Sequence, residues 1–295
     1  MKKWMCLLVV MTMVLSLVAC GGTQQEAEST ATVSSPVATE EVTEQPTEAP
    51  TEEPTEAPTE ESTEEPTEEP TEEPVEKVRP DVIQMVINSD GSATNAVAGG
   101  PVITAHGGSK TVSVDPATGL NVAKLTGGTC LYNAQIGDYY GDMEDGFMVE
   151  IYFKIDSLPS KDPYWGIADN CEAGGFGLYV VDGKIRFDMH IDGAYQKLSD
   201  TKAIETDRWY HVMFGWDSDV LCLYIDGQLV AEYETNYGRM GFPPNATAQY
   251  LAIGGCCSAG SNGGQAIVGS IGACNLYLGG MDADQVAIIY SDLMQ

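Results

Sequence analysis

From Asp81 onward, short apolar runs alternate with turn residues at intervals of roughly ten residues. The runs are rich in Val, Ile, Tyr and Phe, and Gly, Asp and Asn separate them. Many short strands joined by tight turns are typical of a β-sandwich or barrel. The pattern therefore predicts one all-β domain over residues 81–295.

Two hairpins are the clearest elements of this domain. In each, two apolar runs flank an Asp-Gly pair: 177–181 and 184–191 around Asp182-Gly183, and 220–225 and 228–233 around Asp226-Gly227. Asp-Gly tolerates the positive φ angles that two-residue hairpin turns require. The run Arg208–Trp216 turns at residues 217–219 into the second hairpin, so we expect three antiparallel strands in succession.

Side-chain alternation assigns the two faces of the strand over residues 184–191. Its odd positions are apolar, namely Ile185, Phe187, Met189 and Ile191, whereas the even positions Arg186, Asp188 and His190 are polar. One face is then expected in the core and the other in water. On the solvated face, Asp188 and His190 form a candidate polar pair for contacting a ligand.

The domain is predicted to end in a short helix. Asp282 can cap it, with Gln285 as the third helical residue, and Met281 can pack on Val286 as a hydrophobic staple. We expect about two helical turns over Ala283–Tyr290.

The first residues have the pattern of an export signal. Two lysines precede the apolar run Trp4–Val18, which is short for a bilayer span. Leu17–Cys20 resembles the lipobox of bacterial lipoproteins, which implies a signal peptide over residues 1–19 and a lipidated Cys20. Two or more acyl chains would anchor the protein stably on the outer side of the cell membrane. An ordinary signal peptide and an uncleaved anchor helix are the alternatives.

Residues 20–80 are predicted to be a disordered linker. From Glu44 they repeat Pro-Thr-Glu-Glu or Pro-Thr-Glu-Ala, and eighteen glutamates face only two basic residues, Lys77 and Arg79. Such a segment repels itself and stays extended. At about 3 Å per residue, a stalk of roughly 55 residues would reach on the order of 150 Å.

The net charge of −30 comes largely from this linker. Residues 81–295 contain 10 basic and 26 acidic side chains, which gives −16, and no cluster of basic and aromatic residues. Nucleic acid and anionic membrane surfaces are therefore not expected as partners.

Six cysteines remain in the predicted domain: Cys130, Cys171, Cys222, Cys256, Cys257 and Cys274. Their spacing does not match a zinc site, and six cysteines in an exported domain allow 15 sets of three disulfides. We expect one bridge near the C-terminus, from Cys274 to Cys256 or Cys257. Cys222 lies in an apolar strand, where a buried free thiol is natural.

The segment Arg208–Val230, RWYHVMFGWDSDVLCLYIDGQLV, resembles the Trp-x-His-Val strand, turn and hairpin of laminin G-like jelly rolls, which belong to the concanavalin A-like lectin and glucanase sandwiches. FMVEIYFKID resembles an early strand, YLAIGG a late strand, and residues 267–292 the final strand and helix. The resemblance implies a two-sheet antiparallel jelly roll, usually a binding module for glycans or proteins. Gly272 and Ala273 replace the usual Asp-Glu, so any role of that pair is absent.

Catalytic chemistry has little support in the sequence. The resemblance implies that Trp209 and His211 pack and hydrogen-bond inside the sandwich, and that Glu150 is structural. Glycoside cleavage requires two carboxylates across the bond, and related glucanases carry them as Glu-x-Asp-x-x-Glu on one strand. No such strand is present in this chain.

Two loops combine aromatic rings with oxygen ligands. The segment Gly137–Gly146 contains Tyr139, Tyr140 and Asp142, and a second segment contains Tyr164, Trp165, Asp169 and Asn170. Tyrosine and tryptophan rings stack on sugars, and carboxylate and amide oxygens suit calcium. Calcium is therefore a candidate ion at Asp142 or at Asp169 and Asn170. Trp165 is either a ligand-stacking residue or a residue of the core.

These observations favour a non-enzymatic binding module for glycans or glycoproteins, displayed outside the cell on a stalk. A glycan hydrolase of the sandwich glucanase type is one alternative. A structural envelope or adhesion protein with protein partners only is the other.

Overall fold

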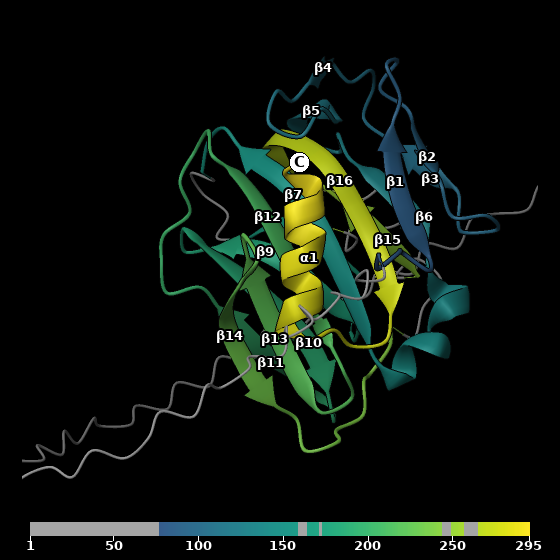
Figure 1. Ribbon diagram of the computed structural model, residues 1–295, viewed down its shortest axis with the longest axis vertical. Helices are drawn as coiled ribbons and strands as arrows, with labels where there is room; N and C mark the ends of the chain where they lie inside the picture. The colour runs from purple at the N-terminus through teal and green to yellow at the C-terminus, as the bar shows by residue number, and fades with distance from the viewer. Residues whose placement is uncertain (1–76, 159–163, 171–172, 244–248, 257–264) are drawn as a thin grey trace, which may run out of the picture. The chain divides into compact units, whose positions relative to one another are not determined.

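The computed structural model describes residues 77–158, 164–170, 173–243, 249–256 and 265–295. In this part of the chain, sixteen strands pair mainly in antiparallel fashion and one helix follows them (Figure 1). The predicted all-β jelly roll is confirmed. Residues 1–76, with Cys20 and most of the predicted linker, lie outside the described residues.

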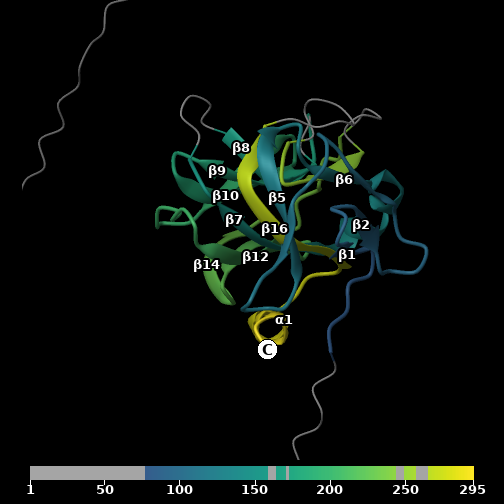
Figure 2. The ribbon, with the colours of Figure 1, turned by 90° about the horizontal axis from the view of Figure 1, so that it is seen from above.

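The strands form two layers that pack face to face (Figure 2), and a parallel bridge between Gly166 and Ala266 joins the two layers into one continuous sheet. One layer, which we call the front layer and which lies behind the other in Figure 1, has the spatial order β3 (Ile103–Ala105), β6 (Tyr132–Gln135), β15 (Tyr250–Ile253), β8 (Tyr164–Asp169), β9 (Phe176–Val181), β10 (Lys184–Ile191) and β11 (Ala194–Ser199). The back layer has the order β14 (Gln228–Glu234), β13 (Val220–Ile225), β12 (Trp209–Trp216), β7 (Phe147–Ile155) and β16 (Ala266–Leu278), with β1 (Ile83–Ile87) and β5 (Asn121–Gly128) beyond β16. Two short strands, β2 (Ala93–Asn95) and β4 (Val112–Val114), pair with β1 and β5.

Both predicted hairpins are present, as β9–β10 and β13–β14. Their turns have positive φ angles at both residues, 50° and 71° at Asp182 and Gly183, and 50° and 74° at Asp226 and Gly227. This is the geometry for which Asp-Gly is selected in two-residue turns. The predicted strand before the second hairpin is also present, as β12.

The core lies between the layers and contains the apolar face of β10 as predicted, with Ile185, Phe187, Met189 and Ile191 buried. The opposite face is less solvated than the alternation indicated. Asp188 is 5% exposed, because it forms two hydrogen bonds of 2.7 Å to the Arg186 guanidinium on the same strand. Burial raises the pKa of Asp188, although Arg186 and Lys197 act in the opposite direction.

A helix, α1 (Ala283–Leu293), covers the outer face of the back layer (Figure 1). Asp282 caps it and forms the predicted capping box with Gln285. The helix ends three residues later than predicted, at Leu293, and near this end Asp292 forms an ion pair of 2.9 Å with Lys77. Local sequence does not contain that contact.

A buried polar network lies on this helix-covered face. Glu150 Oε1 is 3.1 Å from His211 Nε2, and Glu150 Oε2 accepts hydrogen bonds from Asn275 at 2.7 Å and Tyr277 at 2.5 Å. The structural roles expected for Glu150 and His211 are confirmed, but His211 does not lie between the sheets, as the resemblance implied. His211 faces α1, with its ring 5.4 Å from that of Tyr290.

Cys274 is a free thiol buried in the core between the layers. The predicted bridge from Cys274 to Cys256 is therefore wrong, because the Cys274 side chain points into the sandwich and is enclosed by apolar residues. Cys257, the other predicted partner, lies outside the described residues. Cys222 is a buried free thiol, as predicted.

Candidate functional site

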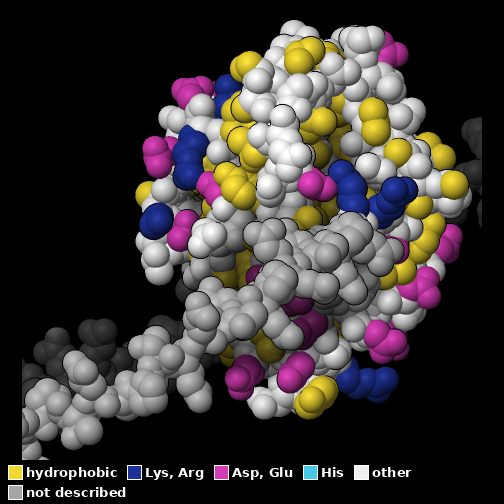
Figure 3. Space-filling model, in the orientation of Figure 1, with side chains coloured by type: hydrophobic (Ala, Val, Ile, Leu, Met, Phe, Trp, Pro, Cys, Tyr) yellow, Lys and Arg dark blue, Asp and Glu magenta, His cyan; other side chains and the backbone are white. Residues whose placement is uncertain are grey.

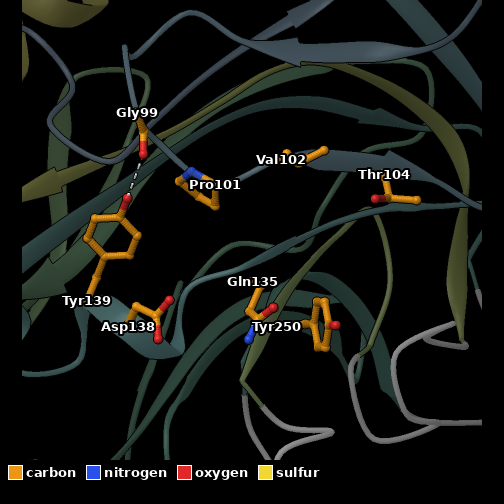
Figure 4. Close-up of a pocket in the computed structure, with 8 residues that line it drawn as sticks. All are labelled: Gly99, Pro101, Val102, Thr104, Gln135, Asp138, Tyr139 and Tyr250. Atoms are coloured by element: carbon orange, nitrogen blue, oxygen red, sulfur yellow. Dashed lines mark hydrogen bonds between the residues drawn. The ribbon is translucent and has the colours of Figure 1, made fainter.

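A surface pocket of about 340 Å³ opens at the β3 side of the front layer. Eight residues line it: Gly99, Pro101, Val102, Thr104, Gln135, Asp138, Tyr139 and Tyr250 (Figure 4). In the view of Figure 4, the two tyrosines stand on opposite sides, with Asp138 and Gln135 between them. We refer to it as the tyrosine pocket.

The floor of the tyrosine pocket is built where β6 meets β15. Gln135 ends β6 directly opposite Tyr250, which begins β15. The chain then turns into the 3-10 helix η1 (Gly137–Tyr139), which carries Asp138 and Tyr139. The Gly137 amide donates to the Gln249 carbonyl at 3.1 Å, so η1 is held against β15 and its side chains stay beside Tyr250.

The opposite wall is the loop before β3, and Asn95 holds it. The Asn95 amide donates to the Val82 carbonyl at 2.9 Å and to the Pro101 carbonyl at 3.1 Å. Its carbonyl oxygen accepts from two backbone amides. The Tyr139 hydroxyl adds a longer hydrogen bond of 3.4 Å to the Gly99 carbonyl. The wall is thus fixed to β1 and to η1.

We expect Asn95→Asp to lower the free energy of unfolding by about 1–3 kcal/mol, since it removes both donated bonds and leaves two carbonyls unpaired. Urea denaturation followed by circular dichroism measures the change. Asn236→Asp is the matched control, because Asn236 is exposed in a turn and Asp also tolerates its φ of 52°. Equal midpoints for the two variants would show that Asn95 does not hold the wall.

The lining suits a polyhydroxylated ligand. Two half-buried tyrosine rings offer apolar faces, while the carboxylate of Asp138, the amide of Gln135 and the hydroxyl of Thr104 offer hydrogen-bond partners. Sugars combine apolar C–H faces with hydroxyl groups, so they match both sets of groups.

The predicted aromatic pair Tyr139 and Tyr140 is split by the structure. Tyr139 lines the pocket, but Tyr140 lies behind it, with its ring stacked 4.3 Å from that of Phe242. Asn170 donates to the Tyr140 hydroxyl at 2.9 Å and to the Tyr250 carbonyl at 3.0 Å. Asn170, a predicted calcium ligand, is fully buried and supports the pocket from behind.

The other predicted calcium ligands lie elsewhere. Asp142 is exposed at the start of the 3-10 helix η2 (Asp142–Asp145). Asp169 is fully buried at the end of β8 and accepts a hydrogen bond of 2.5 Å from the Tyr179 hydroxyl. Within the described residues, no three His, Cys, Asp or Glu side chains are grouped to hold a metal ion. Calcium binding stays a prediction.

The remaining predicted ligand residues lie away from the tyrosine pocket. Trp165 packs, partly buried, against the core, which was its alternative position. The Asp188–His190 pair is not formed: Asp188 binds Arg186, while His190 lies edge-on to Tyr195 with ring centroids 4.9 Å apart. Tyr164 begins β8, and its side chain lies outside what the structure describes.

Sequence reasoning missed most of the tyrosine pocket. Asp138 lies in the predicted loop Gly137–Gly146, and Gln135 ends the strand just before it, but Thr104 and Tyr250 are strand residues far from that loop in the chain. Only the pairing of β3, β6 and β15 brings them together. Gln135 is the one exposed residue of β6, whose three preceding residues are buried, so the strand carries no alternation that could have indicated it.

The family comparison decides the classification. Residues 132–287 match a laminin G family of the concanavalin A-like lectin/glucanases superfamily. The matched range contains four of the residues that line the tyrosine pocket, Gln135, Asp138, Tyr139 and Tyr250. The chain belongs to this superfamily. Residues 39–76 match a family described as the PT disordered repeat, which covers much of the predicted linker. No curated protein matches the chain.

Solved structures share the superfamily fold at low identity. One comes from work on the cell entry of botulinum neurotoxin type C, which depends on interaction with two ganglioside molecules. It has a TM-score of 0.56 and 11% identity, and the match covers 73% of this chain and 52% of that one. The receptor binding domain of botulinum neurotoxin C/D mosaic serotype has a TM-score of 0.55 and 13% identity, and the match covers 72% of this chain and 51% of that one. The chain thus spans about half of these structures. At such identity, the likeness concerns the fold alone.

No helix in the described part of the chain has both the length and the apolar character that a membrane crossing requires.

Proposed function

We propose that this domain is a non-enzymatic module that binds glycans in the tyrosine pocket. The observation that carries the proposal is the placement of Asp138 and Gln135 between Tyr139 and Tyr250 on a lectin-like jelly roll (Figure 4). Two stacking rings with polar groups between them are complementary to a sugar ring. The superfamily contains lectins, which is consistent with this role.

Hydrolysis is the less favoured function. Cleavage of a glycosidic bond requires two carboxyl groups separated by about 5 to 10 Å. Asp138 is the one carboxylate among the residues that line the tyrosine pocket. Elsewhere, Glu150 is buried beneath α1, and Asp169 and Asp188 are buried with hydrogen-bond partners on the front layer.

We further propose that a lipidated Cys20 and the acidic segment before residue 81 display the domain outside the cell. Support comes from the lipobox-like Leu17–Cys20 and from the match of residues 39–76 to a disordered repeat. A long extended tether places a binding pocket well away from a membrane.

Glycan-array binding of the purified full-length chain tests the proposed function. Tyr250→Ala is expected to weaken binding of the retained glycans about tenfold, equivalent to roughly 1.4 kcal/mol, because one stacking surface is lost. Tyr233→Ala is the matched control, since Tyr233 is an exposed tyrosine on β14 in the other layer and should bind like the wild type. If the wild type retained no glycan, only protein partners would remain as candidate ligands.

A further inference from the structure

The tyrosine pocket has acidic surroundings. The three segments that line it, residues 96–105, 132–145 and 249–256, contain four acidic side chains and not one Lys or Arg. Asp138 lies in the pocket, and Asp142, Glu144 and Asp145 follow it, exposed on η2. Figure 3 shows acidic side chains along the lower right-hand edge of the molecule, where Figure 1 draws the 3-10 helices, with Lys or Arg side chains above them.

The lysines nearest to these segments in sequence have other contacts. Lys110 is 6% exposed, donates to the His106 carbonyl at 2.6 Å and lies 4.6 Å from the Tyr132 ring centroid. Lys124 forms an ion pair with Asp156. Neither is among the residues that line the tyrosine pocket, so the charge of Asp138 has no cationic partner within the lining.

We infer that the tyrosine pocket prefers neutral and amino sugars to anionic ones, with Asp138 as the specificity-determining residue; this rests on the proposed function. A sugar carboxylate or sulfate would lose water and meet a like charge without a cation to offset it. A neutral sugar can instead donate a hydroxyl to Asp138, which is a charge-assisted hydrogen bond. An amino sugar brings an ammonium group that would pair with the same carboxylate.

The test measures the full-length chain against matched oligosaccharide pairs. Lactose is compared with 3′-sialyllactose, cellobiose with cellobiouronic acid, and chitobiose with its fully deacetylated form. We expect about five- to tenfold weaker binding of each anionic member, because one exposed charge pair contributes modestly in water. Deacetylated chitobiose should bind at least as well as chitobiose, and the preferences should shrink in high salt, which screens surface charges.

Two substitutions locate the preference. Asp138→Asn should bring the neutral and anionic members to within about twofold, while Asp138→Lys should reverse the order, since the repulsion becomes attraction. Glu144→Gln is the control: it removes one exposed charge that does not line the pocket, so discrimination should stay near the wild-type value.

The outcomes separate this inference from the proposed function. Equal binding of neutral and anionic members by the wild type, or discrimination unchanged by Asp138→Lys, would overturn the inference and leave a glycan-binding pocket. Absence of binding to every oligosaccharide would overturn the proposed function, and the inference with it. If Asp138→Lys alone loses all binding, the inference is judged by the result for Asp138→Asn, which keeps the shape of the side chain.

Discussion

Replacing Glu150 with alanine should lower the free energy of unfolding by about 3–5 kcal/mol, because it removes the central acceptor of a buried hydrogen-bonded network. Glu150 is 3% exposed and His211 is 1% exposed. The carboxylate is the partner of His211, Asn275 and Tyr277 together. Its removal leaves the buried His211 and Tyr277, and the partly buried Asn275, without that partner.

Urea denaturation of the full-length chain, followed by circular dichroism, measures this loss. Glu150→Gln is the matched control, because the amide keeps the volume and part of the hydrogen bonding and should therefore cost less. An unchanged urea midpoint for Glu150→Ala would contradict a stabilising role for the network.

The same network should make stability depend on acid. Burial by itself raises the pKa of Glu150, but the hydrogen bond and charge of His211, together with Tyr277 and Asn275, outweigh it, so the folded-state pKa lies below the ordinary value. The unfolded state then takes up the proton more readily than the folded state. The stabilisation is present above a pH of about 4.3 and is lost as the pH falls through the lowered folded pKa. Glu150→Gln should flatten this part of the stability profile.

Phe214→Ala should be comparably destabilising, by about 3–5 kcal/mol, because it opens a cavity in the closed core. Phe214 is fully buried on β12, and its ring centroid lies 5.0 Å from that of Phe187 and 6.4 Å from that of Phe176, both on the front layer. The side chain therefore joins the two layers. Thermal or urea unfolding measures the change.

Two controls accompany this variant. Phe214→Leu keeps much of the volume and should lose markedly less stability. Tyr233→Ala removes an aromatic side chain that is 45% exposed, so its effect should stay within about 0.5 kcal/mol. Similar midpoints for Phe214→Ala and Tyr233→Ala would mean that the interface between the layers does not depend on this ring.

Local sequence was informative wherever a short segment contained its own structural reason. The Asp-Gly turns, the apolar face of β10 and the Asp282 capping box depend on residues within a few positions of one another. Strand order was predicted only through resemblance, because pairing joins segments as distant as β1 and β16.

Faces were harder to assign than strands. Alternation separates two sides of a strand, but it does not say what covers each side. His211 faces a helix rather than the opposite sheet, and Asp188 is buried beside Arg186 rather than solvated. Cys274 likewise is a free thiol in the sandwich core, although the cysteine count of an exported domain had led us to expect a disulfide there.

The sequence by itself determined the all-β class, the hairpin turns and the capped terminal helix, because these follow from the spacing of neighbouring residues. Tertiary structure alone decided the tyrosine pocket. Tyr139 was a candidate from its loop. Tyr250, by contrast, is brought to the pocket by the pairing of β15 with β6, and Pro101 is held there by the hydrogen bond that its carbonyl accepts from Asn95. A binding site assembled from residues more than a hundred positions apart depends on strand pairing, which local patterns do not encode.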